Sequence, residues 1–166
     1  MPENNQIFLG LGSNVGDRYS YLKKGIYLIN NHPHIWIINE SYIYESPPLY
    51  NIEQTYYYNM VLQIDTNLEP LDLLREMKII EQKLGRKLNK IKNSPRELDI
   101  DILAMGDTII NTKTLTIPHP FIIERKFVLK PWNDIAADFI IPEIEKSIKL
   151  LLDLTKDSSL IKRILI

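Results

Sequence analysis

Residues 98–103 (LDIDIL) constrain the fold more than any other segment of the chain, because apolar and acidic side chains alternate along them. In a β-strand successive side chains point to opposite faces, so the apolar residues of this segment would face a core. Asp99 and Asp101 would then share the other face, with Cα atoms about 6.6 Å apart at the usual rise per residue. Aspartate is rare in strands, and such departures from local propensity tend to mark functional sites.

The composition is that of an ordinary globular protein, and we expect residues 1–166 to form a single domain. The absence of cysteine excludes disulfide scaffolds and thiolate zinc sites. A net charge of −1 gives no general attraction to nucleic acid or to an anionic membrane. The first residues lack the pattern of a signal peptide, and no apolar run approaches the roughly 20 residues of a membrane span. We therefore expect a cytoplasmic protein. We also expect a monomer.

The hydrophobic periodicity predicts an alternation of strands and helices along the first two thirds of the chain. Strands are predicted at 6–11, 35–44, 56–65 and from 99, and amphipathic helices at 17–31 and from Pro70 to a C-terminal cap at Gly85. Further helices are predicted near 122–129 and at 143–154. This βαββαβ order predicts an α+β fold, a ferredoxin-like sandwich in which helices pack on a mainly antiparallel sheet.

A basic loop precedes the two aspartates and changes how they are interpreted. Alone, acidic residues on a strand can simply protect a sheet edge from aggregation, and a charged loop is usually just solvated. The loop contains the residues Arg86, Lys87, Lys90, Lys92 and Arg96. Carboxylates can bracket Mg²⁺, and arginine forms a bidentate fork with phosphate oxygens. Together they indicate a site for a polyphosphate.

Three further motifs have both a structural and a functional interpretation. The glycine-rich segment Gly10–Gly16 has the wrong spacing and context for a dinucleotide fingerprint, so we interpret it as a tight turn whose backbone amides line the site. His119 lies between prolines and either faces solvent or contacts a nucleotide. His32 and His34 are expected in a turn at a helix end, because two histidines alone do not make a metal site.

The segment YYYN at 56–59 precedes an apolar strand, and most of its tyrosines are expected to pack against the sheet. Asn59, on the same strand face as Tyr57, could instead pair with the donor and acceptor edge of a heterocycle. The two prolines at 47 and 48 would give such a pocket a rigid wall.

These motifs together resemble the 6-hydroxymethyl-7,8-dihydropterin pyrophosphokinase family of folate biosynthesis. The resemblance extends from about Ile7 to Pro131 and rests on an ordered set of pieces rather than on one motif. The pieces are GSN (12–14), SPPL (46–49), YYN (57–59), Glu81, GR (85–86), PRELDIDIL (95–103), LTIPHP (115–120), and Arg125 with Phe127. The family fold is a ferredoxin-like sandwich, in agreement with the order of elements.

The resemblance implies transfer of pyrophosphate from ATP to the hydroxymethyl oxygen of the pterin, with release of AMP. Asp99 and Asp101 would hold two Mg²⁺ ions on the triphosphate, and the catalytic residues would be Asp99 with the phosphate-binding Arg86 and Arg96. The implied ATP contacts are Glu81, Ile102, Thr116, His119 and Arg125. The implied pterin contacts are Ser46, Pro47, Leu49, Tyr57, Asn59 and Phe127. The partners would be these two small molecules, with neither nucleic acid nor membrane.

The chain departs from the family pattern at three places. Leu88 stands where many relatives have a second arginine, Asn93 with Ser94 replaces Trp-Gly, and Pro120 replaces an aromatic residue. A nearby lysine could restore the charge of the missing arginine but not its planar fork. These changes bear on the rate and on loop closure more than on the reaction type.

Two other functions are compatible with parts of the sequence. A metal-dependent phosphohydrolase or nuclease could use Asp99 and Asp101, but such sites usually need a third or fourth acidic or histidine ligand. A ferredoxin-like ligand-binding module without catalysis would bind its ligand without Mg²⁺ and would tolerate Asp101→Asn. The ordered set of arginines and aspartates argues against both.

Overall fold

The structure is a computed structural model that describes residues 5–49, 53–87, 92 and 94–166. Its central sheet contains β1 (Ile7–Ser13), β2 (Ile35–Glu40), β3 (Tyr44–Ser46), β4 (Tyr57–Thr66), β5 (Asp99–Met105) and β10 (Lys162–Arg163). The helices are α1 (Arg18–Asn30), α2 (Pro70–Lys83), α3 (Lys126–Ala136) and α4 (Ile148–Leu154), with a 3₁₀ turn at Ile122–Glu124. Two small hairpins join β6 (Ile110–Asn111) to β7 (Thr116–Ile117) and β8 (Ile140–Ile141) to β9 (Lys146–Ser147).

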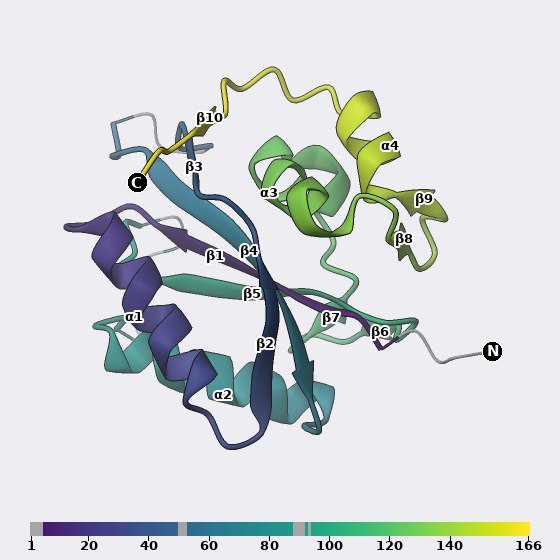
Figure 1. The fold of residues 1–166 in the computed structure, drawn as a ribbon, viewed down its shortest axis with the longest axis horizontal. Helices are drawn as coiled ribbons and strands as arrows, with labels where there is room; N and C mark the ends of the chain where they lie inside the picture. The colour runs from purple at the N-terminus through teal and green to yellow at the C-terminus, as the bar shows by residue number, and fades with distance from the viewer. Residues whose placement is uncertain (1–4, 50–52, 88–91, 93) are drawn as a thin grey trace.

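The sheet is antiparallel throughout, and its order is β10-β3-β4-β1-β5, with β2 also paired to β4. β4 is the longest strand; its first residues pair with β3 and its last residues pair with β2. β1 lies at the centre, between β4 and β5 (Figure 1). This arrangement confirms the predicted α+β fold and the βαββαβ order of its core elements.

The two faces of the sheet carry separate hydrophobic clusters. α1 and α2 cover one face, and α3 and α4 lie on the other (Figure 1). Leu22 of α1, Met77 of α2 and Ile100 of β5 belong to the first cluster. Phe8 of β1 and Trp132 of α3 belong to the second, with ring centroids 5.2 Å apart. A sheet buried on both sides is a rigid platform for groups that project from its strands.

Local sequence signals explain how the two covering helices begin and end. Asp17 caps α1 by accepting a hydrogen bond from the Ser20 N–H. Pro70 occupies the first turn of α2, and Gly85 follows the helix with a φ of 108°, which favours glycine. These boundaries agree with the prediction.

The predicted strand 35–44 is wrong in one respect, because the chain divides it into β2 and β3. A register shift occurs between Ile37 and Asn39. Ser41 then donates its own N–H to the Val61 carbonyl and accepts the Val61 N–H on its hydroxyl oxygen. The Ser41 hydroxyl thus replaces one main-chain acceptor of the sheet. The segment can therefore end its pairing with β4 at β2 and resume it at β3.

The predicted C-terminal helices are also shifted. The helix expected at 143–154 begins only at Ile148, because Glu143 and Glu145 have positive φ angles of 65° and 55° and form the turn between β8 and β9. Ser147 caps α4 by accepting the Leu150 N–H. The helix expected near 122–129 is a short 3₁₀ turn followed by α3, which extends to Ala136. Among the described residues, no helix is both long enough and apolar enough to cross a membrane.

Candidate active site

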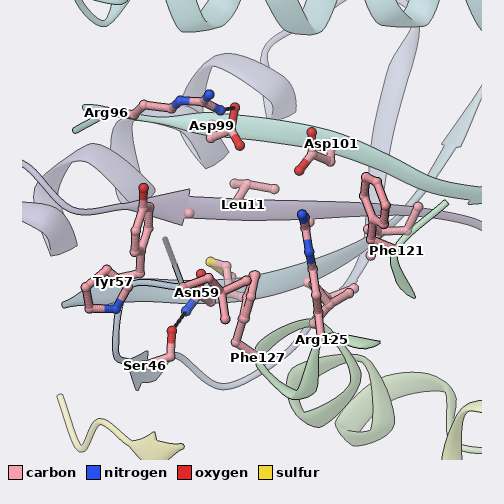
Figure 2. Close-up of a pocket in the computed structure, with 18 of the residues that line it drawn as sticks. Leu11, Ser46, Tyr57, Asn59, Arg96, Asp99, Asp101, Phe121, Arg125 and Phe127 are labelled. Atoms are coloured by element: carbon pink, nitrogen blue, oxygen red, sulfur yellow. Dashed lines mark hydrogen bonds and ion pairs between the residues drawn. The ribbon is translucent and has the colours of Figure 1, made fainter. Parts of the chain in front are cut away.

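A pocket of about 280 Å³ opens over the face of the sheet that α3 covers (Figure 2). Its walls come from β1, β4 and β5, from the segment after β3, and from the residues leading into α3. Most of the predicted site residues line it: Ser46, Pro47, Leu49, Tyr57, Asn59, Arg96, Asp99, Asp101, His119, Arg125 and Phe127. Residues from five separated segments of the chain therefore converge on one cavity.

The two aspartates project from β5 into this pocket, as the alternation in the sequence predicts. Both are half-buried, whereas Leu98, Ile100 and Ile102 are buried in the cluster beneath α1 and α2. Asp99 lies opposite Gly12 of β1, and Asp101 lies opposite Gly10. Residues directly opposite in an antiparallel pair share a face, so the pocket floor beside each carboxylate is a glycine.

Gly10 lies within the predicted strand 6–11, and Gly12 was predicted in the turn 10–16, but both belong to β1, which forms the floor of the pocket. A Cβ on Gly12 would lie 3.2 Å from Asn59 Oδ1 and 3.6 Å from Tyr57 Cδ1. A Cβ on Gly10 would lie 3.2 Å from Leu103 Cδ2. The missing side chains keep open the space between β5 and β4. The signal in the sequence was the alternation G-L-G inside an apolar strand, where glycine often marks a close approach.

Arginines and carboxylates form a connected network beside Asp99. Arg86 Nη1 lies 2.7 Å from Asp99 Oδ1 and 2.7 Å from Glu81 Oε2. Arg96 Nη1 lies 2.9 Å from the same Asp99 oxygen. Figure 2 shows the Arg96–Asp99 pair at one end of the pocket. Two guanidinium groups therefore meet one carboxylate at the place where a polyanion is expected.

Glu81 is buried completely, and its carboxylate organises the network. Oε1 accepts the main-chain N–H of Ile100 at 2.7 Å, and Oε2 accepts from Arg86. Burial, and then the nearby charge of Asp99, raise the pKa of Glu81. Glu81 thus holds both Arg86 and the segment of β5 that carries the aspartates.

The electrostatics at the other carboxylate favour a cation. Burial, followed by repulsion from Asp99, raises the pKa of Asp101 to about 7. Arg125 extends from the α3 side toward the sheet (Figure 2), and its charge partly offsets this rise in the pKa. Half-buried carboxylates on one strand face are more easily ionised when a divalent cation binds between them.

His119 reaches the pocket from the segment that precedes the 3₁₀ turn. Its main-chain N–H donates to the Leu103 carbonyl at 2.9 Å, and its ring Nδ1 accepts the main-chain N–H of Phe121 at 3.3 Å. Burial, and then the charge of Arg125, lower the pKa of His119 to about 4. The imidazole is therefore neutral at neutral pH. Because Nδ1 accepts a hydrogen bond, the ring proton is assigned to Nε2.

The opposite wall is aromatic and amide-bearing. Asn59 is buried, and its Nδ2 donates to Ser46 Oγ at 2.7 Å, which orients the amide (Figure 2). Burial raises the pKa of the neighbouring Tyr57, so its phenol stays protonated. Phe127 enters from the first turn of α3. This wall suits a flat heterocycle with hydrogen-bonding edges.

Among the described residues, four predicted site residues are not part of the pocket lining: Glu81, Arg86, Ile102 and Thr116. Arg86 still reaches the site through Asp99. The Ile102 side chain is buried in the cluster under α1 and α2, and Thr116 lies in β7. Contacts of Ile102 or Thr116 with ATP stay predictions. Leu88, Lys90 and Asn93 lie outside the described residues.

The histidines near the end of α1 take no part in this pocket. His32 Nε2 lies 3.0 Å from Glu76 Oε2 and so joins the end of α1 to α2. No cluster of three or more histidine, aspartate or glutamate side chains suited to a metal ion occurs in the described part of the chain.

Comparison with known proteins links this chain to one family. Residues 8–137 match the family described as 7,8-dihydro-6-hydroxymethylpterin-pyrophosphokinase, and this range contains every predicted site residue. A protein of Aquifex aeolicus named 2-amino-4-hydroxy-6-hydroxymethyldihydropteridine pyrophosphokinase is 42% identical, over 86% of this chain and 88% of that protein. One of the same name from Bacillus subtilis is 39% identical, over 80% of this chain and 78% of that protein.

Other relatives are much longer. The folic acid synthesis protein fol1 of Pneumocystis carinii is 40% identical over 84% of this chain, which spans only 19% of that protein. A solved HPPK-DHPS structure of Plasmodium falciparum with pteroate has a TM-score of 0.72 at 19% identity, covering 90% of this chain and 42% of that one. This structural likeness supports the fold. From the match over residues 8–137 and the close relatives of similar length, the chain belongs to the 7,8-dihydro-6-hydroxymethylpterin-pyrophosphokinase family.

Proposed function

We propose that the protein transfers the pyrophosphoryl group of ATP to the hydroxymethyl oxygen of 6-hydroxymethyl-7,8-dihydropterin and releases AMP. One observation carries the proposal beyond family membership. A single pocket joins a wall of carboxylates and arginines to a wall of aromatic and amide side chains. The first wall suits a metal-bound polyphosphate, and the second suits a pterin ring.

Asp99 and Asp101 would hold Mg²⁺, with two ions on the triphosphate as the family resemblance implies. The residues present fit such a site. Mg²⁺ in nucleotide enzymes is commonly bound by one or two carboxylates, with phosphate and water oxygens completing the octahedron. β5 supplies two half-buried carboxylates on one face, and burial, followed by the charge of Asp99, raises the pKa of Asp101. When bound, Mg²⁺ would neutralise the polyphosphate and polarise the phosphorus under attack.

Arg86 and Arg96 would exchange partners when ATP binds. Both guanidinium groups contact the same Asp99 oxygen, at 2.7 Å and 2.9 Å. The transferred phosphates offer equivalent anionic oxygens, and a guanidinium binds them through a planar fork. Glu81 would keep its ion pair with Arg86. The Arg86 guanidinium would therefore stay beside Glu81 while it exchanges Asp99 for a phosphate oxygen. The two arginines would then stabilise the charge of the pyrophosphoryl group in transfer.

The nucleotide contacts that we propose rest on the pocket lining for two residues and on the family resemblance for three. His119 and Arg125 line the pocket on the side of Asp101, and the neutral imidazole can donate from Nε2. Glu81, Ile102 and Thr116 complete the set that we propose for ATP. The side chain of Ile102 is buried on the opposite face of β5, so its contact would involve main-chain atoms.

The pterin would occupy the pocket between β4, the segment after β3 and α3. Asn59 and Ser46 are linked by a 2.7 Å hydrogen bond, which sets the amide for the heterocycle edge. Tyr57 and Phe127 supply aromatic faces, and Pro47 and Leu49 close the rim. A substrate held on this wall would direct its hydroxymethyl oxygen toward the carboxylate wall for attack in line with the leaving AMP.

Formation of AMP from Mg-ATP, with and without 6-hydroxymethyl-7,8-dihydropterin, tests the proposal. Pterin-dependent AMP is expected, and Asp101→Asn should slow its formation by at least about a hundredfold. ADP or inorganic phosphate, formed without pterin, would contradict pyrophosphoryl transfer and favour a hydrolase. Binding of pterin that is independent of Mg-ATP and yields no AMP would instead favour a ligand-binding module.

We propose further that residues 1–166 act as one domain and as a cytoplasmic monomer on these small molecules, without nucleic acid or membrane. The support for one domain is that both hydrophobic clusters are built on one sheet. Light scattering coupled to size-exclusion chromatography tests the monomer, and a mass of twice 19.5 kDa would contradict it.

A further inference from the structure

Asn14 follows β1 directly and is 2% exposed, although it lies outside the pocket lining and outside the set predicted for the site. Its main-chain N–H donates to the Arg96 carbonyl at 3.1 Å, and its side-chain Oδ1 accepts the Arg96 N–H at 2.8 Å. Both main-chain polar groups of Arg96 are therefore held by one residue. The guanidinium of Arg96 contacts Asp99. The two hydrogen bonds from Asn14 therefore fix the main-chain position from which this side chain, which we place at the phosphates, extends.

The same amide reaches the other half of the pocket. Asn14 Nδ2 donates to Gln54 Oε1 at 3.0 Å and to the Thr55 carbonyl at 3.4 Å. Gln54 lines the pocket, and Thr55 is two residues before Tyr57. The buried Asn14 side chain thus links two segments. One carries Arg96, which we place at the phosphates, and the other leads into β4, which carries the residues that we assign to the pterin.

We infer that Asn14 is a positioning residue that keeps Arg96 and the residues before β4 at the separation that the two substrates require; the inference rests on the proposed function. Transfer demands that the pyrophosphoryl group and the hydroxymethyl oxygen meet within a few tenths of an ångström of the productive geometry. Asn14 does not touch either substrate in this account. It acts by joining the two walls that hold them.

Only an amide of this length satisfies all its partners. The Arg96 N–H needs an acceptor, whereas the Gln54 and Thr55 oxygens need donors. Aspartate would keep the acceptor and lose both donors. The Gln54 amide can rotate to donate to such a carboxylate, but the Thr55 carbonyl cannot. Asn14→Asp should therefore have an effect between those of the native residue and Asn14→Ala.

Ser13→Ala is the matched control. Ser13 is the neighbour of Asn14 and is fully buried, and within the described residues its Oγ has no hydrogen-bond partner. Its substitution removes one buried polar atom from the same place without breaking a bond. Any general effect of shortening a buried side chain at the end of β1 should appear in both variants.

Hydrogen exchange of the unliganded protein, read by mass spectrometry, tests the positioning role without an activity assay. In Asn14→Ala we expect faster exchange in residues 94–98 and, to a smaller extent, in residues 53–56, with β4 and β5 unchanged. The smaller change follows because Arg18 also donates to the Tyr56 carbonyl at 2.7 Å. Ser13→Ala should exchange like the wild type. Native exchange of residues 94–98 in Asn14→Ala would overturn the inference.

Steady-state AMP formation supplies the second arm. At saturating Mg-ATP and pterin, and at a temperature where all variants are folded by circular dichroism, kcat of Asn14→Ala should fall about tenfold or more, as expected when two or more neutral hydrogen bonds that hold the reacting groups are lost. A kcat within twofold of the wild type would overturn the inference. If the wild type itself forms no AMP, the proposed function fails, while the exchange data still test whether Asn14 holds both segments.

Discussion

Glu81 accepts the main-chain N–H of Ile100 at 2.7 Å, at the one residue that separates Asp99 from Asp101 along β5. Ile100 pairs with Leu11 of β1, and Glu81 lies on α2. A side chain from α2 thus binds the strand between the two carboxylates and also holds Arg86 at 2.7 Å. The buried charge is stabilised by these partners, and it sets the positions of three side chains that we place at the phosphates.

Glu81→Ala should lower the free energy of unfolding by about 3 kcal/mol, because it leaves the buried Ile100 N–H without its acceptor and removes a partner of Arg86. Glu81→Gln should cost less, since the amide oxygen can still accept from Ile100. Urea unfolding followed by circular dichroism measures both. Asp72→Ala, which breaks an exposed pair with Arg75 on the same helix, is the control and should cost less than about 1 kcal/mol. Equal losses for Glu81→Ala and Asp72→Ala would show that Glu81 is not a structural anchor.

Asp101→Asn should reduce kcat by at least about a hundredfold with little change in stability, because the side chain is half-buried and lines the pocket. Chelation of Mg²⁺ should abolish AMP formation in the wild type. Isothermal titration calorimetry with Mg-ATP, beside thermal unfolding, separates lost metal affinity from a lost fold. Turnover near the wild-type rate in Asp101→Asn would refute its assignment as a metal ligand.

The sequence predicts the parts of this site that depend on local periodicity. Alternation along 98–103 correctly places Asp99 and Asp101 on one face, and Pro70 with Gly85 correctly bounds α2. Each of these features is decided by residues within a few positions of one another. That the distant segments form one pocket was predicted instead from the family resemblance, because periodicity alone does not specify which segments meet.

The features that the sequence missed depend on tertiary contacts. Nothing near Ser41 shows that its hydroxyl replaces a ladder bond to Val61 and lets the strand 35–44 divide. Nothing near Asn14 shows that Arg96 and Thr55, 82 and 41 residues away, are its partners. The role of Gly12 as open floor is likewise decided by Asn59 on the neighbouring strand. Such relationships arise when strands pair, and a single segment does not contain them.

Gly12→Ala should weaken pterin binding more than ATP binding. The new methyl group would lie 3.2 Å from Asn59 Oδ1, tighter than most contacts of a Cβ atom, so the amide that we assign to the heterocycle would have to shift. We expect KM for the pterin to rise about tenfold, which corresponds to roughly 1.4 kcal/mol. Steady-state kinetics with each substrate varied in turn gives the two KM values.

Gly10→Ala is the control for this prediction. Its methyl group would also meet an atom at 3.2 Å, but that atom is a terminal methyl carbon of Leu103 and not the amide that we assign to the heterocycle. Because Gly10 lies beside Asp101, a residual effect should fall on Mg-ATP. A larger rise in the pterin KM for Gly10→Ala than for Gly12→Ala would contradict the assignment of the two halves of the pocket.

His119 should remain neutral down to a pH well below that of an ordinary histidine. Burial and the charge of Arg125 lower its pKa to about 4 from the usual value of 6.5, so the folded state favours the uncharged ring. Its contribution to stability is therefore complete above pH 6.5 and is lost as the pH falls from 6.5 toward 4. Titration of the histidine ring protons by NMR, with His119→Asn to assign the signal, should give one midpoint below about 5. A midpoint above 6 for His119 would mean that the ring can be protonated at neutral pH, and the neutral Nε2 donor proposed for ATP would then be wrong.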